Sequence, residues 1–165
     1  MARGIDYFET QIHLDDKGHY LFIPVSACID MGTGGLLRDM ELINAPLKEK
    51  EMGEAVLRAI EKSQKTPSVQ SSDTLQGNFI VDDNFSVEND IYYDWYTITA
   101  GLRQGSGYEI RAWRRDGVMD QYSFNLPESA TIEEIGEAVL KCFDYINKNF
   151  GFDKIAPKAR RDKKI

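Results

Sequence analysis

Apolar residues recur at helical spacing in two stretches of the chain, and the two stretches are nearly the same sequence. Residues 51–60 read Glu-Met-Gly-Glu-Ala-Val-Leu-Arg-Ala-Ile, and residues 134–143 read Glu-Ile-Gly-Glu-Ala-Val-Leu-Lys-Cys-Phe. Apolar side chains three and four positions apart form one face of a helix. We therefore predict two amphipathic helices, with Gly53 and Gly136 allowing each to pack closely on a sheet. The expected buried faces are Met52, Ala55, Val56, Ala59 and Ile60 in the first helix and Ile135, Ala138, Val139, Cys142, Phe143 and Ile146 in the second.

Stretches rich in β-branched and aromatic residues precede each helix and predict strands. Pro24, inside one of them, lacks an N–H group and indicates an edge or a bulge. Asp116-Gly117 is the two-residue signal of a hairpin. Thr131 and Glu134 form a capping box that opens the second helix, and Gly151 is the glycine that ends it. The expected strands are residues 7–14, 19–29, 36–43, 79–81, 92–102, 108–114 and 118–126, with residues 30–35 as a loop.

This order of elements predicts an α+β fold, an antiparallel sheet with two helices, built from two related βββα halves. The half-repeats cover about residues 5–64 and 78–150, and the polar stretch 64–77 joins them as a linker. We expect a single domain over residues 1–150 and a mobile basic tail over 151–165.

The overall composition is that of a globular protein without a membrane span. The 165 residues are 42% hydrophobic and 28% charged. No apolar run approaches the about 18 residues that cross a bilayer, and the N-terminus meets polar residues too early for a secretory signal. Cys28 and Cys142 lie in apolar periodic contexts, so we expect buried free thiols. These features predict a cytoplasmic protein.

Charge is distributed unevenly along the chain. The net charge is −7 for the whole chain and +4 for the last fifteen residues, which leaves −11 for residues 1–150. A body this acidic repels nucleic acid and attracts a basic partner, although solubility alone explains the acidity equally well. A further possibility is that the tail tethers RNA. The basic residues of the tail are Lys154, Lys158, Arg160, Arg161, Lys163 and Lys164.

Residues that could catalyse a reaction or hold a metal are few. His13 and His19, the two histidines, have no Cys-x-x-Cys or His-Glu-x-x-His pattern beside them, so we interpret them as surface or turn residues. Neither cysteine has a histidine nearby, and no Gly-x-Ser-x-Gly motif is present. Gly32–Gly35 could cradle a phosphate, but the Lys-Ser/Thr of a P-loop is missing, which favours a strand connection. We expect no catalytic residue, no metal, no cofactor and no enzyme activity.

The most unusual composition lies between Phe79 and Tyr96, where acidic and aromatic residues interleave without any Lys or Arg. Acidic side chains steer a basic surface, and Tyr and Trp anchor interfaces. In the alternative interpretation, alternate aromatic residues of a strand point into the core and the acidic residues form a solvated loop. Both interpretations stay open. The candidate partner-binding residues are Asp82, Asp83, Glu88, Asp90, Tyr93, Asp94 and Trp95.

The paired helix blocks, and the Ser-Ala-Thr-Ile-Glu-Glu approach to the second, resemble a family of immunity proteins from bacterial contact-dependent growth inhibition systems (the CdiI-type family). The resemblance covers residues 20–146 in layout. It implies a cytoplasmic protein that binds and neutralises one cognate toxin domain, and a basic nuclease would suit an acidic inhibitor. No binding residue carries over from the family. The alternative is a small-ligand-binding module or an enzyme with a cleft between the two halves, lined by Gly32–Gly35. We expect no nucleic acid and no membrane among the partners.

Overall fold

The structure is a computed structural model that describes most of the chain. The described residues are 7–28, 30, 33–75, 79–82, 85–87, 95–115 and 119–153, with the backbone alone described at 33, 79–82 and 85–87. The strands are β1 (Tyr7–Leu14), β2 (His19–Cys28), β3 (Thr33–Leu36), β4 (Glu41–Asn44), β5 (Ser68–Val69), β6 (Phe79–Asp82), β7 (Phe85–Val87), β8 (Tyr96–Arg103), β9 (Gly107–Trp113) and β10 (Met119–Leu126). The helices are α1 (Glu49–Lys65), a 3-10 turn (Ser71–Asp73) and α3 (Ile132–Phe150).

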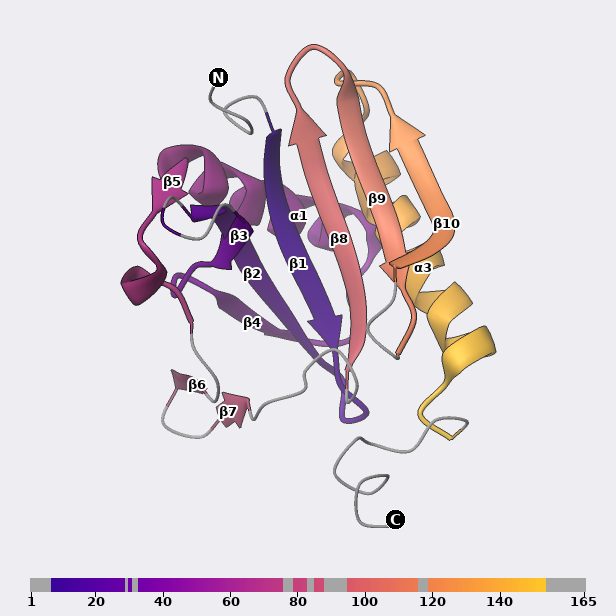
Figure 1. Cartoon of the computed structure of the whole chain (residues 1–165). Helices are drawn as coiled ribbons and strands as arrows, with labels where there is room; N and C mark the ends of the chain where they lie inside the picture. Colours follow the sequence, from indigo (N-terminus) through magenta and orange to yellow (C-terminus); the bar gives the residue numbers. More distant parts are fainter. Residues whose placement is uncertain are drawn as a thin grey trace.

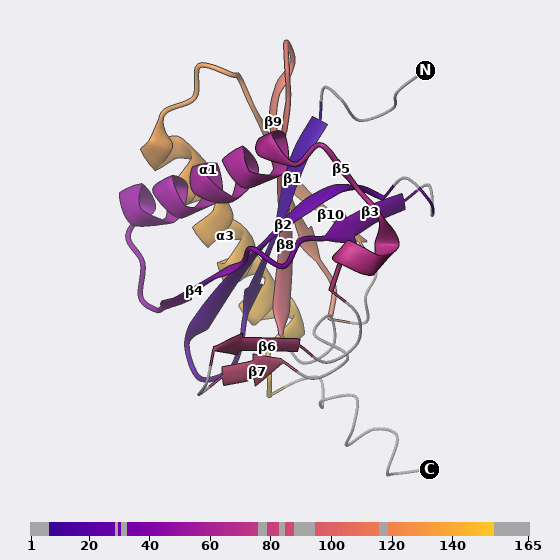
Figure 2. The ribbon, with the colours of Figure 1, turned by 90° about the vertical axis from the view of Figure 1, so that its left-hand side faces the viewer.

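Both long helices lie on one face of a twisted sheet (Figure 1, and from the side in Figure 2). The strand order is β10-β9-β8-β1-β2-β3, with β4 and β5 also paired to β2. Every pairing in this sheet is antiparallel except that of the two-residue β5. The predicted fold class, α+β with an antiparallel sheet and two helices, is confirmed.

The arrangement of the sheet agrees with two βββα halves. β1 and β8 lie side by side and pair along their whole length, from Tyr7 opposite Arg103 to Leu14 opposite Tyr96. Outward from this pair, β2 and β3 follow on one side, and β9 and β10 follow on the other. α1 comes after the first set of strands and α3 after the second. The halves therefore join through a continuous ladder of strands.

The glycine-rich stretch predicted as a loop is partly a strand. β3 pairs with the end of β2, and a Cβ added to Gly35 would lie 2.5 Å from Cγ2 of Thr74. The glycine therefore admits a neighbouring segment that a side chain would exclude. The predicted strand 36–43 is divided between the end of β3 and β4. The other predicted strands appear as β1, β2, β6, β8, β9 and β10 with ends shifted by a few residues, and Asp116-Gly117 lies outside the described residues.

Pro24 marks a change of neighbours on the outer side of β2. β4 pairs with His19–Phe22 and β3 with Val25–Cys28, so neither strand pairs with Pro24. The Pro24 carbonyl oxygen accepts a hydrogen bond of 2.8 Å from the Leu37 N–H. Because the N and O of one strand residue point to the same side, the missing N–H also faces this break. The edge-like position predicted for Pro24 is confirmed.

The predicted linker, residues 64–77, forms part of the sheet margin. β5 pairs in parallel with Ala27 and Cys28. The Asp30 carboxylate then accepts hydrogen bonds from the Ser71 backbone N–H (2.9 Å), the Ser71 hydroxyl and the Cys28 thiol. These bonds lower the pKa of Asp30 to about 2, so its charge holds the segment at ordinary pH.

The repeated glycines lie where α1 crosses α3. A Cβ added to Gly136 would overlap the carbonyl oxygen of Glu49, and a Cβ added to Gly53 would overlap that of Ile132. Glu49 lies four residues before Gly53. Ile132 lies four before Gly136, so the internal repeat relates the two contacts. The prediction of helix–sheet packing was wrong, because these glycines allow the two helix backbones to touch each other.

The predicted helix faces are confirmed as core. All eleven of their residues are buried, and they pack against alternate strand residues such as Ile12, Phe22 and Ile98. The capping box is also present, with the Glu134 N–H donating to the Thr131 hydroxyl at 3.1 Å. Both cysteines are free and buried, as predicted.

The chain beyond α3 packs against the body at first. Gly151 has a φ of −56°, so it is not the left-handed glycine expected at this helix end. Phe152 stacks on Tyr96 with ring centroids 4.0 Å apart, and the buried Arg115 donates a 3.1 Å hydrogen bond to the Gly151 carbonyl. The mobile tail was wrongly predicted to begin at Gly151, because these contacts hold its first residues. Residues 154–165 lie outside the described residues.

Candidate functional site

Most of the acidic and aromatic residues predicted to bind a partner lie outside the part of the chain whose side chains are described. Asp82 ends β6, where only the backbone is described. Trp95 is 8% exposed and packs with Leu21 and Ile23 in a small second core. Trp95 is therefore a core residue and not an exposed anchor, because its ring covers apolar side chains of β2. The residues outside the description are Asp83, Glu88, Asp90, Tyr93 and Asp94.

His13 is a buried residue of β1, so its prediction as a surface or turn residue was wrong. It is 0% exposed, with Nδ1 3.0 Å from the Thr97 hydroxyl and Nε2 3.0 Å from the Gln11 side-chain oxygen. Burial lowers the pKa of His13 to about 3, so the ring is neutral at ordinary pH. His19 does lie beside the predicted turn, 2.7 Å from the Asp15 carboxylate.

The face of the sheet opposite the helices carries polar and aromatic side chains, and we call it the helix-free face. Side chains alternate along a strand, and the even-numbered residues of β1, β8 and β9 fill the core beneath the helices. Their odd-numbered neighbours therefore point to the other side. The strand register then aligns the residues of this face in rows. They are Tyr7, Glu9, Gln11, Thr99, Arg103, Glu109, Arg111, Trp113, Met119, Ser123 and Asn125.

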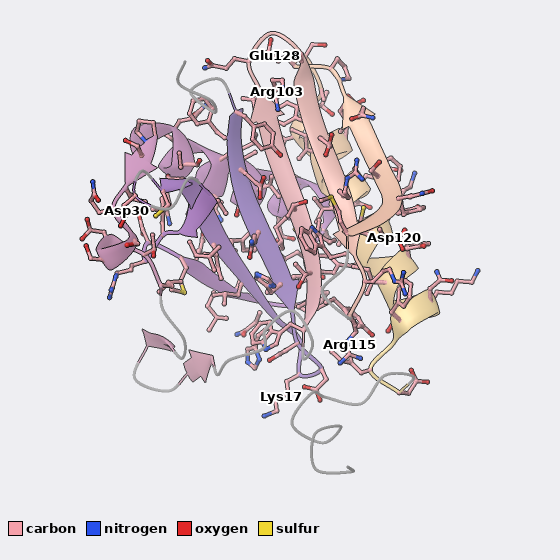
Figure 3. All side chains as sticks on the ribbon, viewed as in Figure 1. Lys17, Asp30, Arg103, Arg115, Asp120 and Glu128 are labelled. Carbon is pink, nitrogen blue, oxygen red and sulfur yellow. The ribbon has the colours of Figure 1, made fainter. Side chains whose placement is uncertain are left out.

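Tyr7 lies across the face, over a strand residue that has no side chain. A Cβ added to Gly101 would overlap the Tyr7 phenol, so the glycine makes room for the ring. The Arg103 guanidinium lies 4.8 Å from the ring centroid (Arg103 is labelled in Figure 3). Burial raises the pKa of both Tyr7 and Glu9. The Tyr7 hydroxyl interacts with the Glu9 carboxylate and lowers the pKa of that carboxyl. These contacts fix the position of the ring on the face.

Charges of both signs surround this aromatic residue. Glu9 and Glu109 are the cross-strand neighbours of Gly101 on its two sides. Burial raises the pKa of Glu9 most, the Tyr7 hydroxyl lowers it, and the negative charge of Glu109 raises it further. Arg111 Nε lies 3.4 Å from a Glu109 carboxylate oxygen as an ion pair, and it forms no hydrogen bond to a described residue. The carboxylates of Glu9 and Glu109 and the guanidinium groups of Arg103 and Arg111 therefore lie on three adjacent strands, β1, β8 and β9.

Trp113 is the second aromatic residue of the helix-free face. Its indole N–H donates a hydrogen bond of 3.3 Å to the Thr99 hydroxyl. Met119, its neighbour across the ladder, is 50% exposed, the largest exposure of any described large hydrophobic side chain. Trp, Tyr, Arg and Met are the residue types enriched at protein interfaces. Five residues of the helix-free face, Tyr7, Arg103, Arg111, Trp113 and Met119, belong to these types.

The hollows near this face are open to solvent and lined by polar as well as apolar groups. One of about 310 Å³ has Tyr7, Arg103, Glu109 and Asn125 among its lining residues. Its volume is at the lower end of the range usual for small-ligand sites, which are more enclosed and mainly apolar. Among the described residues, no group of three His, Cys, Asp or Glu side chains is placed to hold a metal. The geometry favours recognition of a surface over capture of a small molecule.

The boundary between the two halves is filled by packed elements. β1 pairs with β8, and α1 touches α3 at the repeated glycines. Gly34 and Gly35, proposed above to line a cleft, are strand residues of β3 paired with β2. The described geometry therefore does not favour the alternative of a ligand or substrate bound between the halves.

Comparison with known proteins identifies no relative. No protein-family model matches the chain, and no curated protein or solved structure does so. Among the described residues, neither helix is long and apolar enough to cross a bilayer. The function must therefore be argued from the chain's own residues.

None of the residues of the helix-free face was predicted to bind a partner. One signal was available in the sequence, because Tyr108, Ile110 and Ala112 alternate with Glu109, Arg111 and Trp113. That alternation shows that these residues share a polar face. It does not show whether another part of the chain covers that face. The candidate residues between 82 and 95 were instead predicted from the acidic and aromatic composition of that segment.

Proposed function

We propose that this chain is an immunity protein of a bacterial contact-dependent growth inhibition system, which binds a cognate toxin domain in the cytoplasm and neutralises it. The helix-free face carries this proposal. It is a broad polar surface with two aromatic side chains, Tyr7 and Trp113, held by neighbouring groups. Such a surface suits a protein partner, and the resemblance of the paired helix blocks to immunity proteins suggests the class.

The charge of the chain supports a basic partner, which we propose is a nuclease domain. A nuclease grips phosphate with Lys and Arg, and residues 1–150 carry a net charge of −11. Opposite charges accelerate association and fix orientation. Glu9 and Glu109 supply carboxylates on the helix-free face itself, close to Tyr7.

The test is co-expression with the toxin domain encoded immediately upstream, followed by copurification and a binding measurement. We expect the wild-type chain to rescue growth and to form a stable complex. Trp113→Ala and Tyr7→Ala should each weaken binding at least about tenfold, since aromatic anchors contribute much of the energy of an interface. Lys50→Ala, at an exposed position of α1, is the matched control and should bind as wild type.

The outcomes distinguish a wrong function from a wrongly placed binding surface. Absence of rescue and of a complex would contradict the immunity proposal. A complex that tolerates both substitutions would place the interface elsewhere. Charge reversal at Asp82, Asp83 and Asp94 then tests the acidic segment, where slower association would confirm the interpretation made from the sequence. Each variant should first be shown to melt at the wild-type temperature.

A further inference from the structure

The two edges of the sheet are built differently. At one edge, the outer neighbours of β2 are β3, β4 and β5, strands of four, four and two residues. β10 forms the other edge; it is eight residues long and has no described neighbour on its outer side. It contains neither Lys nor Pro, which edge strands commonly use to prevent pairing, but it does contain a bulge between Met119 and Ser123, which is another such device. The outer backbone groups of residues 123–126, after the bulge, can therefore accept a further strand.

Aromatic side chains lie beside this edge on the helix side. Tyr122 stacks on Tyr145 of α3 with ring centroids 4.2 Å apart, and Phe124 meets Tyr122 edge-on at 5.4 Å. All three are only partly buried. They line a hollow of about 570 Å³ between β10 and α3. The charged residues of its lining are Lys141, Asp144 and Lys148.

Asp120 holds this edge in shape (it is labelled in Figure 3). The ladder between β10 and β9 shifts register between Met119 and Ser123. Within this bulge, the Asp120 carboxylate accepts hydrogen bonds from the Tyr122 N–H (2.9 Å) and the Tyr145 hydroxyl (3.0 Å). The bulge and the aromatic stack are therefore tied together, and the regular part of the strand begins after it.

The exposed side of α3 is complementary to itself. Glu137, Lys141, Asp144 and Lys148 are spaced by four, three and four residues, so they form one stripe of alternating charge. If two such helices run antiparallel about an axis midway along the stripe, Glu137 faces Lys148 of the second copy. Lys141 then faces Asp144. A two-fold interface requires this kind of self-complementarity.

We propose that two copies of the chain form a dimer through β10. The two strands pair antiparallel over their regular residues, 123–126, which continues the sheet from one copy into the next. The aromatic side chains beside the edge are then covered at the seam, and the α3 stripes lie antiparallel next to it. The helix-free face stays open in both copies, so this inference does not depend on the proposed function.

The test uses two charge variants of the full chain in sedimentation experiments over a concentration series. Lys141→Glu with Lys148→Glu makes the stripe wholly acidic, and Glu137→Lys with Asp144→Lys makes it wholly basic. Each variant alone should dimerise at least about tenfold more weakly than wild type, because like charges then face each other. An equal mixture of the two should recover the dimer.

A matched control separates the stripe from net charge. Lys50→Glu with Lys65→Glu on α1 makes the same charge change, and Lys65 pairs with Glu61 as Lys141 pairs with Glu137. This control should stay as dimeric as wild type. A wild-type chain that is monomeric throughout the series would overturn the proposal. So would acidic and basic variants that dimerise normally alone, or a mixture that remains monomeric.

Discussion

The two faces of the sheet differ in composition, although the same strands form both: one is apolar and covered by helices, and the other is largely polar. On the helix side, the even-numbered residues of β1, β8 and β9 are apolar or small and pack beneath two helices whose backbones touch. On the helix-free face, the odd-numbered residues include Glu, Arg, Tyr and Trp, and some charged groups there are partly removed from water. Stability therefore depends mainly on the helix side. The helix-free face can carry charged and aromatic side chains that are not required for folding.

The helix-free face is itself divided. Over β2, the side chains of Leu21 and Ile23 are covered by Trp95 and by partly buried residues that include Leu36 and Leu75. Over β8 and β9, the face stays polar. The buried His13 lies on the strand between these two parts. Substitutions on the two faces, and at this boundary, should therefore have separable effects.

The largest effect is expected at the helix crossing. Gly136→Val should lower the free energy of unfolding by about 3 kcal/mol, because the added side chain meets backbone of α1 that cannot move aside. Denaturant unfolding measures this. The control is Gly105→Ala, at a φ of +82° with no atom within 4 Å, which should cost only about 1 kcal/mol of backbone strain. Equal losses in the two variants would show that the crossing is not tightly packed.

An intermediate effect is expected at His13. Its pKa is lowered to about 3 in the folded chain, from an ordinary value of about 6.5. Between these values the unfolded chain binds a proton that the folded chain does not, so stability falls as the pH falls. The stability that depends on neutral His13 is fully present above about pH 6.5. Below that pH, the free energy of unfolding falls by at most about 1.4 kcal/mol per pH unit from this residue.

His13→Gln removes this titration. The difference in unfolding free energy between wild type and His13→Gln, measured from pH 7 down to pH 4, should shift steadily against the wild type. Other titrating groups are shared by the two proteins and cancel in the comparison. A difference that stays constant with pH would contradict a buried, neutral His13.

The smallest effect is expected on the helix-free face. Burial raises the pKa of Glu9, so its ionised form is unfavourable in the folded chain. Glu9→Gln should raise the free energy of unfolding at pH 7 by about 0.5–1 kcal/mol and weaken binding of the proposed partner. The gain should disappear below about pH 4, where the carboxyl of the unfolded chain is also protonated. Glu109→Gln, at an exposed position, should change stability less. A loss of stability in Glu9→Gln would show that the carboxylate serves the fold.

Local patterns in the sequence predicted much of the fold. Both helix faces, the capping box at Thr131 and most strands were predicted, because spacing and capping depend on neighbours along the chain. The α+β class followed from the order of these elements. The repeat also predicted related halves, and the sheet arrangement agrees with them.

The candidate site was not predicted, because it depends on which face the helices cover. Alternation in β9 shows that Glu109, Arg111 and Trp113 share a face, yet coverage is decided by the path of distant segments. The candidate segment at residues 82–95 was chosen by composition, which cannot distinguish an exposed ring from a buried one. Trp95 shows the consequence, since its burial depends on β2.

The sequence by itself determined the periodic elements, the apolar side of each helix and the acidic character of the chain, since these depend on residue type and spacing alone. Tertiary structure alone decided that Gly53 and Gly136 face another helix, that a glycine-rich stretch forms a strand, and that His13 is enclosed. Each of these is a contact between residues far apart in the chain. Such contacts arise only when the sheet and both helices have packed together.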